Sequence, residues 1–427
     1  MSKLLVSIEI KGRQIPVGSI SGKDAYTAVY SYDEEYVHAP GAVPISICLP
    51  LQAEAFSSEQ TRRFFEGLLP EGFLRGMVAG SAHKDHSDYL ALLTMLGEEC
   101  LGAVQLKETE SAEDLSKTLT PSYRPLTGKE LYDLAAEGAQ KSAELVLQTH
   151  LSLTGASGKI GAYRSPDGLW YLPMGTAPST HMLKQSHIRY RHLVQTEQLC
   201  QLTARLLGIP TPLSLIVPCR DQDAEGVLLA TQRYDRTFEG STAYASGLLC
   251  PLRLHQEDFG QALGIASIDK YDTDGGNYMK RMFDLLKDRS ASPIEDQFLL
   301  WDIIVFHYLI GNTDGHIKNY SLRYTPDLRA VRLAPAYDIV STAVYENHSR
   351  QMALSIGGTT EFDALNRDSF RTAAAEIGLN ETMFMERFDR LAARFVPKLF
   401  EAAGMLAQEG FEEVAAIAET IAGLHAI

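Results

Sequence analysis

The segment FLLWDIIVFHYLIGNTDGHIKNYSLR, residues 298–323, changes character in its middle. Residues 298–310 are mostly apolar and form a run long enough for a buried helix. Gly311 is a suitable end for this helix, because glycine tolerates the left-handed conformation of a helix C-cap. The polar residues NTDGHIKN follow at positions 312–319. We therefore expect a polar loop that is held against a buried helix.

Asp314 and Asn319 lie five positions apart in this polar loop. The catalytic loop of protein kinases has the same spacing: the aspartate accepts the proton of the attacking hydroxyl, and the asparagine holds Mg2+. The spacing therefore indicates phosphoryl transfer. A helix end followed by an ordinary turn explains this segment alone equally well, since Asn, Asp and Gly are turn residues. His316, inside the loop, is a further candidate for contact with a nucleotide.

Two more residues fit this chemistry and stand in the right chain order. Lys184 ends the apolar segment THMLK, and a strand lysine in kinases holds the α- and β-phosphates of ATP. Asp338 lies in LAPAYDIVST, where an apolar strand would deliver a second ligand for Mg2+. Each residue also has an ordinary explanation, a lysine at a strand edge or an aspartate that caps the next segment. The order of the residues favours the functional reading.

A glycine-rich turn, LSLTGASGKIG at residues 151–161, lies upstream of this lysine. Small residues let backbone N–H groups approach phosphate oxygens, and Lys159 adds a positive charge. The turn matches neither the Walker A pattern nor the G-x-G-x-x-G pattern, and a tight hairpin explains it equally well. The turn contains three hydroxyl residues that are candidates for phosphorylation: Ser152, Thr154 and Ser157.

The segment QRYDR, residues 232–236, ends a predicted strand just before the helical part of the chain. In a kinase this is the place of the hinge, whose backbone hydrogen-bonds adenine. The side chains of Arg233, Asp235 and Arg236 could equally form an ion-pair cluster between lobes. Glu197, on a predicted helix, either pairs with Lys184 or lies on a solvated face.

The composition is that of an ordinary globular protein, with 427 residues, 45% of them hydrophobic, and a net charge of −15. This length predicts two or three lobes. The acidic balance disfavours non-specific binding to nucleic acid unless a partner assists. Five scattered cysteines without a C-x-x-C pair indicate a reduced, cytoplasmic protein with neither zinc site nor disulfide. No apolar run approaches the roughly 20 residues of a membrane span, so we expect no membrane partner.

Local periodicity predicts a β-rich first part and a helical end. Strands are predicted at residues 4–10, 14–19, 26–32, 45–50, 170–173, 180–184, 214–218 and 226–234. Helices are predicted after Ser57 and at residues 88–100, 129–136, 193–207, 298–310 and 411–424. The pattern is helical almost throughout from residue 251, and residues 108–125 are expected to be a linker or surface excursion.

Eight blocks, in order, resemble the HipA family, serine/threonine kinases that serve as toxins of bacterial type II toxin–antitoxin systems. The blocks are LSLTGASGK, HMLKQ, LVQTEQLCQLTARLLGI, QRYDR, LRLHQEDFGQALGI, KYDTDGG, LIGNTDGHIKN and LAPAYD. The resemblance implies an α+β, protein-kinase-like bilobal fold with an added N-terminal β-rich subdomain and an all-α C-terminal lobe. Its expected parts are an N-terminal α+β subdomain (1–107), a kinase N-lobe with glycine loop, ATP lysine and hinge (108–250), and a helical C-lobe with the catalytic loop (251–427).

The resemblance also implies a role for each candidate residue. Asp314 is expected to be the general base, Asn319 and Asp338 to bind Mg2+, and Lys184 to bind ATP. Further nucleotide contacts are expected from Thr154, Gly155, Ala156, Ser157, Gly158, Lys159, Gln232, Arg233, Tyr234, His316 and Lys318. Autophosphorylation is expected on Ser152, and would eject the loop and switch the kinase off. Ser157 and Gly158 depart from the better-known loops, which have Gln or Pro nearby, so the favoured phosphosite stays open.

The implied cofactors are ATP and Mg2+. The implied partner is a small helix-turn-helix antitoxin, with operator DNA bound only through the antitoxin complex. The implied protein substrate is a translation protein such as an aminoacyl-tRNA synthetase. The alternative is a catalytically silent, nucleotide-binding corepressor that acts with a DNA-binding antitoxin. The presence of Asp314, Asn319 and Asp338 together favours the kinase.

Overall fold

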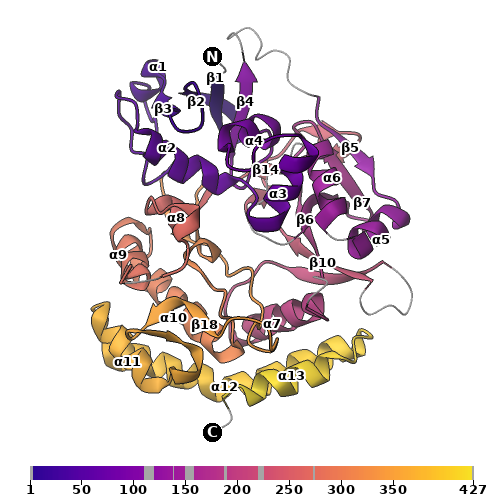
Figure 1. Ribbon diagram of the computed structural model, residues 1–427, viewed down its shortest axis with the longest axis vertical. Coiled ribbons are helices and arrows are strands. Elements are labelled where there is room, and N and C mark those ends of the chain that lie inside the picture. The colour runs from indigo at the N-terminus through magenta and orange to yellow at the C-terminus, as the bar shows by residue number, and fades with distance from the viewer. Residues whose placement is uncertain are drawn as a thin grey trace. The chain divides into compact units, whose positions relative to one another are not determined.

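Figure 1 shows the computed structural model of the chain. The structure describes residues 3–109, 120–137, 139–149, 158–186, 190–219, 226–272 and 275–425. The chain forms two compact units, and neither is continuous in sequence. The first comprises Met1–Ile188, Val217–Ser267 and Arg323–Ala330, and the second comprises Arg189–Ile216, Ile268–Leu322 and Val331–Ile427. The boundaries expected near residues 107 and 250 stay predictions.

The first unit begins with a four-stranded antiparallel sheet of order β3-β2-β1-β4. Its strands are β1 (Lys3–Ile10), β2 (Arg13–Ser21), β3 (Val29–Tyr32) and β4 (Val104–Thr109). Alternate residues of β1, namely Leu4, Val6 and Ile8, are buried, as expected for a strand with one face on a core. The predicted hairpin of β1 and β2 is confirmed.

Four helices complete this part of the first unit. They are α1 (Glu34–Val37), α2 (Ser58–Phe65), α3 (Gly72–Ser81) and α4 (Tyr89–Leu96). α2 begins after Ser57, which forms the predicted reciprocal capping box with Gln60. Phe64 and Phe65 of α2 are buried. Helix α3 was not predicted, because only Leu74, Val78 and Ala79 of it are buried and its glycines obscure the period.

The strand expected at residues 45–50 is not formed, and a single bridge joins Ser46 and Leu49 there. Side chains take up the N–H groups of this segment. The Ile45 N–H donates to the Tyr32 hydroxyl at 2.9 Å, and the Ile47 N–H donates to the Glu257 carboxylate at 3.1 Å. The prediction was wrong because a strand needs its N–H groups to bond a neighbouring strand, and here side chains already accept those hydrogen bonds.

A second sheet of six strands has the order β5-β7-β6-β8-β10-β9. The strands are β5 (Ser122–Pro125), β6 (Lys159–Arg164), β7 (Trp170–Met174), β8 (His181–Gln185), β9 (Ser214–Pro218) and β10 (Val227–Gln232). Helix α5 (Gly128–Glu137) was predicted, whereas α6 (Ala139–Thr149), which packs against β6 and β7, was not. β5 lies inside the segment that was expected to be a linker.

Three short strands precede residue 251: β11 (Arg236–Thr237), β12 (Tyr244–Ala245) and β13 (Leu248–Leu249). Short strands also interrupt the region that was expected to be helical from residue 251. The first are β14 (Leu252–Arg253) and β15 (Gln256–Asp258), which leads into helix α8 (Phe259–Ala262). β16 (Ser321–Tyr324), β17 (Val331–Leu333), β18 (Gln351–Ile356) and β19 (Thr359–Glu361) follow later. The expectation of near-continuous helix was therefore wrong, although the mixed α+β class is confirmed.

The second unit is built mainly from six helices in its described residues. They are α7 (Leu193–Leu207), α9 (Tyr278–Arg289), α10 (Pro293–Ile310), α11 (Arg367–Glu376), α12 (Glu381–Gln408) and α13 (Val414–Gly423). Helix α7 has the bounds that its periodicity predicted. The long helix α12 packs against α7, α10, α11 and α13 (Figure 1). Its neighbour α10 is buried along most of its length, including Trp301 and Phe306.

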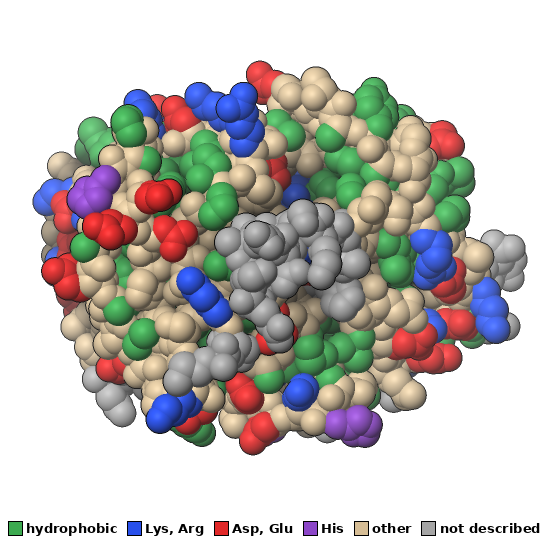
Figure 2. Space-filling view, turned by 90° about the horizontal axis from the view of Figure 1, so that it is seen from above, with side chains coloured by type: hydrophobic (Ala, Val, Ile, Leu, Met, Phe, Trp, Pro, Cys, Tyr) green, Lys and Arg blue, Asp and Glu red, His purple; other side chains and the backbone are tan. Residues whose placement is uncertain are grey.

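The distribution of charge and the hydropathy of the helices bear on the partners that this chain could have. On the face that Figure 2 shows, acidic and basic side chains are mixed, and the described residues there form no extended basic patch. No helix in the described ranges is both long enough and apolar enough to cross a membrane.

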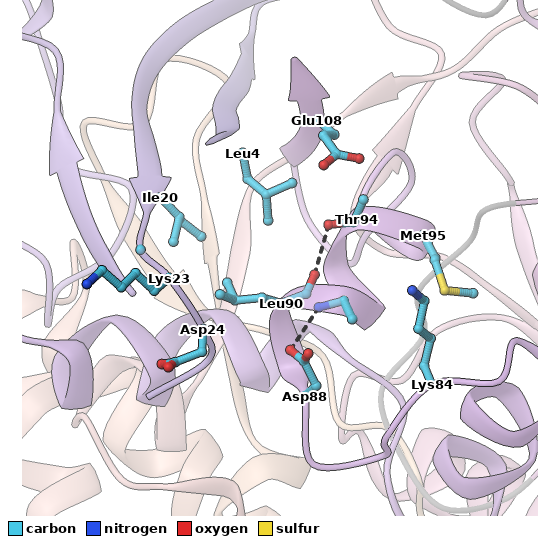
Figure 3. Close-up of a pocket in the computed structure, with 12 residues that line it drawn as sticks. Leu4, Ile20, Lys23, Asp24, Lys84, Asp88, Leu90, Thr94, Met95 and Glu108 are labelled. Carbon is cyan, nitrogen blue, oxygen red and sulfur yellow. Dashed lines mark hydrogen bonds between the residues drawn. The ribbon is translucent and has the colours of Figure 1, made fainter. Parts of the chain in front are cut away.

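A pocket of about 340 Å³ opens beside β1, β2 and α4 in the first unit (Figure 3). Its lining includes the buried Leu4 and Ile20 and the exposed Lys23 and Lys84. Asp88, also in the lining, caps α4 by accepting a hydrogen bond from the Ala91 N–H at 3.1 Å. None of the residues singled out in the sequence lines this pocket, so it does not bear on the predicted chemistry.

Candidate active site

The end of α10 determines where the polar loop begins. Gly311 has a φ of +66°, and the N–H groups of Gly311 and Asn312 donate to the carbonyls of Tyr308 and His307. A Cβ at this glycine would lie 2.6 Å from Leu424 and 2.8 Å from Ala343. The backbone conformation and the close packing therefore both require glycine, which confirms the predicted helix end.

Thr313 anchors the loop just before the candidate base. Its N–H donates to the Thr342 hydroxyl at 2.8 Å, and its own hydroxyl donates to the Ser349 carbonyl at 2.8 Å. Its carbonyl accepts from the N–H of Ala353 at 2.9 Å, which ties it to β18. With three partners in different segments, this residue holds the backbone that enters Asp314.

Asp314 is held by its backbone and leaves its side chain accessible. Its N–H donates to the Asn312 side-chain oxygen at 3.2 Å, and its carbonyl accepts from the Asn319 amide at 3.0 Å. Every other residue from 311 to 320 is buried, whereas Asp314 is half-buried. The loop therefore presents one carboxylate from an otherwise buried segment, which is what a general base needs.

Gly315 has no room for a side chain. A Cβ there would lie 2.4 Å from Nδ1 of His307, and this nitrogen shares a hydrogen bond of 3.1 Å with the Tyr320 hydroxyl. Burial lowers the pKa of His307 to about 4, so the ring is neutral at pH 7. The neutral histidine of α10 thus packs directly under the loop backbone.

Asp338 lies beside this loop but not on a strand. β17 ends at Leu333, and Asp338 has a φ of +53°, which is a left-handed conformation that a strand does not contain. The predicted strand was therefore wrong at this position. The Asn312 side-chain amide donates to the Asp338 carbonyl at 3.5 Å, while its oxygen accepts from the Asp314 N–H. One asparagine thus ties the segments of the two aspartates together.

The residues present fit a magnesium ion that also binds phosphate. Asn319 uses its side-chain nitrogen on the Asp314 carbonyl, which leaves its side-chain oxygen for a metal. Asp338 would supply a carboxylate, and Mg2+ prefers such oxygen ligands. No group of three or more His, Cys, Asp or Glu in the described part of the chain could hold a metal. The remaining ligands would therefore have to be phosphate oxygens and water.

His316 and Lys318, also predicted as nucleotide contacts, are buried in the same loop of the second unit. Lys318 belongs to a short 3-10 helix, Ile317–Asn319, and its carbonyl accepts a hydrogen bond of 2.8 Å from the Tyr337 hydroxyl. The His316 ring meets the ring of Tyr271 edge to face, with 5.5 Å between centroids. Sequence reasoning missed Asn312, Thr313 and Tyr271, whose roles depend on contacts across 26 to 43 positions.

Lys184 and Lys159 stand opposite each other in the sheet of the first unit. They are Cα partners in the antiparallel pair of β8 and β6, so their side chains leave the same face. Lys159 is buried, and Lys184 is half-buried. Two lysines on one face of the sheet concentrate positive charge there, which suits an anion such as phosphate.

The structure describes the glycine turn only from Gly158 onward. Ser152, Thr154, Gly155, Ala156 and Ser157 lie outside the described residues. A Cβ on Gly158 would lie 2.2 Å from the Gln185 amide nitrogen and 3.0 Å from the Ser142 hydroxyl. The close approach of α6 and β8 therefore requires glycine here, which gives a reason for one departure from the family's loop.

The side chains of the predicted hinge segment form a buried arginine cluster within the first unit. Its members are Arg233, Arg236, Arg253, Glu9, Glu99 and Asp235, three cations and three carboxylates. Arg233 lies 2.6 Å from Asp235, and Arg236 lies 2.7 Å from Glu99. Burial would raise the pKa of Glu99, but the arginines outweigh it and lower that pKa to about 2. The predicted ion pairs are thus confirmed for these side chains, but they lie within the first unit and not between lobes.

The backbone of this segment is partly occupied as well. The Arg233 N–H donates to the Thr180 carbonyl at 2.8 Å. Gln232, at the end of β10, is exposed, and the half-buried Tyr234 bonds Gln256 through its hydroxyl. Contact with adenine would therefore fall to Gln232 or Tyr234. Glu197 is buried in α7 of the second unit, so the solvated-face reading was wrong.

Comparisons with known proteins agree along the chain. The family model for the HipA-like C-terminal domain matches residues 151–421, and the model for the HipA N-terminal domain matches residues 8–107. The candidate kinase Y4mE of Sinorhizobium fredii is 32% identical over 366 residues, covering 85% of this chain and 83% of its own. The serine/threonine-protein kinase toxin HipA of Shewanella oneidensis is 26% identical over 428 residues, covering 94% and 90%.

Among solved structures, a chain from the complex of Shewanella oneidensis HipA with HipB and its operator DNA superposes with a TM-score of 0.78. It is 23% identical in sequence, and the match covers 98% of this chain and 96% of that one. This likeness shows that the two proteins share one fold.

Proposed function

This chain belongs to the HipA family, and we propose that it is an ATP- and Mg2+-dependent serine/threonine protein kinase, the toxin component of a type II toxin–antitoxin system. The observation that carries the proposal is the loop of the second unit. Asn312 ties the segments of Asp314 and Asp338 together, Asn319 bonds the Asp314 carbonyl, and Asp314 is the one residue from 311 to 320 that is not buried.

In the proposed reaction an acceptor hydroxyl donates its proton to the Asp314 carboxylate. The hydroxyl oxygen forms a bond to the γ-phosphorus while the bond to the bridging oxygen breaks, and ADP leaves. Asn319 and Asp338 would hold Mg2+, which supplies charge neutralisation for the phosphates. A strong base is not required, because the carboxylate mainly orients the hydroxyl.

Residues of the first unit are also proposed to contact a nucleotide. The opposed Lys159 and Lys184 would neutralise phosphate charge, and Gln232 or Tyr234 would offer backbone groups to adenine. Thr154 to Gly158 would complete the phosphate loop, and Ser152 would be the residue that the kinase phosphorylates on itself. His316 and Lys318 would contribute from the catalytic loop.

The proposed partners follow from the relatives. HipA of Shewanella oneidensis has been solved with HipB and operator DNA, so we propose a small helix-turn-helix antitoxin and operator DNA bound through it. The net charge of −15 and the mixed charges in Figure 2 support dependence on a partner. A translation protein such as an aminoacyl-tRNA synthetase is the proposed substrate.

The test is Asp314→Asn, which keeps the shape of the side chain and removes its charge. We expect transfer of labelled phosphate to fall about 10²- to 10⁴-fold, the usual contribution of a general base, while a fluorescent ATP analogue binds as in the wild type. Asp288→Asn, at an exposed position of α9, is the matched control and should transfer normally.

Two results would contradict the proposal. Phosphate transfer by Asp314→Asn at the wild-type rate would contradict the assignment of Asp314 as the general base. A wild-type chain that labels neither itself nor any protein of a cell extract, yet represses the operator with its antitoxin, would instead support the silent corepressor.

A further inference from the structure

Tyr271 touches the carboxylate that the proposed function assigns as the base. Its hydroxyl donates to Oδ1 of Asp314 at 2.8 Å, across 43 positions of the chain. The tyrosine lies in the KYDTDGG block just before α9 and is 42% exposed, so it stands on the accessible side of the loop.

Two neighbouring side chains, His316 and Lys270, contact the ring of Tyr271. His316, two positions after the base, meets the ring edge to face at 5.5 Å and 85°. The Lys270 ammonium lies 5.4 Å from the ring centroid, within range of a cation–π contact. Both neighbours belong to the second unit, as Tyr271 does.

The backbone around Tyr271 is fixed to the same strand that anchors the catalytic loop. The Asp272 N–H donates to the Ala353 carbonyl at 2.8 Å, and the Ala353 N–H donates to the Thr313 carbonyl at 2.9 Å. The Asp272 carboxylate accepts from the N–H of Tyr278 and of Ser355, each at 3.3 Å. Ala353 of β18 is therefore bonded to the residue after Tyr271 and to the residue before Asp314, which ties the two segments together.

We propose that Tyr271 is a positioning residue for phosphoryl transfer, an inference that rests on the proposed function. Its hydroxyl holds Oδ1 of Asp314, so that Oδ2 points to the acceptor hydroxyl and receives its proton. A carboxylate on one single bond turns easily, and a charge-assisted hydrogen bond from a fixed donor restricts that rotation. The tyrosine itself exchanges no proton in the reaction.

The test is Tyr271→Phe, which removes the hydroxyl and keeps the ring against His316. We expect kcat to fall about tenfold, as loss of a hydrogen bond to a charged group implies, with KM for ATP unchanged. Tyr278→Phe is the matched control: its hydroxyl also donates a hydrogen bond, to the Asp269 carbonyl at 2.6 Å, but lies away from the carboxylate. Its kcat should stay near that of the wild type.

A double variant separates positioning from general damage. In an Asp314→Asn background, Tyr271→Phe should have no further effect on kcat, because both act through one carboxylate. Multiplied losses would overturn the inference, and so would a kcat for Tyr271→Phe equal to or above the wild type. Full activity of Asp314→Asn alone would instead contradict the proposed function, in which Asp314 is the base, and not the role of Tyr271 by itself.

Discussion

At the scale of single residues, Glu257 is a buried carboxyl group that accepts hydrogen bonds from three neutral donors. It is 1% exposed and accepts hydrogen bonds from the Ser46 hydroxyl, the Ile47 N–H and the Tyr324 hydroxyl. Burial raises its pKa to about 7, more than these donors lower it. The carboxyl group is therefore partly protonated near neutral pH.

This raised pKa predicts a pH dependence of stability. In the unfolded chain Glu257 titrates near its usual value of 4.5, so the folded form binds the extra proton between about pH 4.5 and 7. Its contribution is present below pH 4.5 and is lost as the pH rises through 7. We expect Glu257→Gln to flatten the fall in the free energy of unfolding between pH 5 and 8, measured by urea denaturation. An unchanged slope would contradict the assignment.

At the scale of elements, the buried arginine cluster joins parts that are far apart in sequence. Glu9 lies in β1, Arg236 in β11 and Arg253 in β14, while Glu99 precedes β4. Each of the three arginines has at least one carboxylate partner in the cluster, and the charges balance. Such a group is costly to break because the remaining charges stay buried.

Removing the central carboxylate should therefore destabilise the first unit strongly. We expect Glu99→Ala to lower the free energy of unfolding by about 3–5 kcal/mol, since buried arginines lose their partner. Because the pKa of Glu99 is lowered to about 2, its contribution is present above its usual value near 4.5 and is lost as the pH falls toward 2. Asp389→Ala, which breaks the exposed pair with Arg367, is the control and should change little. Equal effects would contradict the role of the cluster.

At the scale of the whole molecule, two units share a chain that crosses between them several times. The family models cover residues 8–107 and 151–421, so both units contain family sequence. The chain is acidic, and the described face in Figure 2 carries mixed charges. Operator recognition by this chain alone is therefore unfavourable.

Operator binding should depend on the antitoxin. We expect no measurable shift of operator DNA by the chain alone at about 150 mM salt, and a clear shift when the cognate antitoxin is added. Fluorescence anisotropy of labelled operator DNA would measure both. Tight, sequence-specific binding by the isolated chain would contradict the proposed partnership.

Local signals were sufficient for several parts of the chain. The period of α7 predicted its bounds, Gly311 marked the end of α10, and the turn at Lys11 and Gly12 predicted the first hairpin. The helix, its end and the hairpin could be predicted because each depends on neighbours within a few positions, where periodicity, caps and turns act. The order of Lys184, Asp314, Asn319 and Asp338 indicates phosphoryl transfer, and that assignment stays a prediction.

Other features depended on contacts that no local pattern contains. Residues 45–50 do not form a strand, because the Tyr32 hydroxyl and the Glu257 carboxylate accept hydrogen bonds from their N–H groups. Asp338 has a left-handed backbone conformation, and its carbonyl accepts a hydrogen bond from Asn312. The pairing of Tyr271 with Asp314 likewise joins positions 43 apart. Side chains from distant segments compete for the same backbone groups, and that competition is resolved only when the chain is folded.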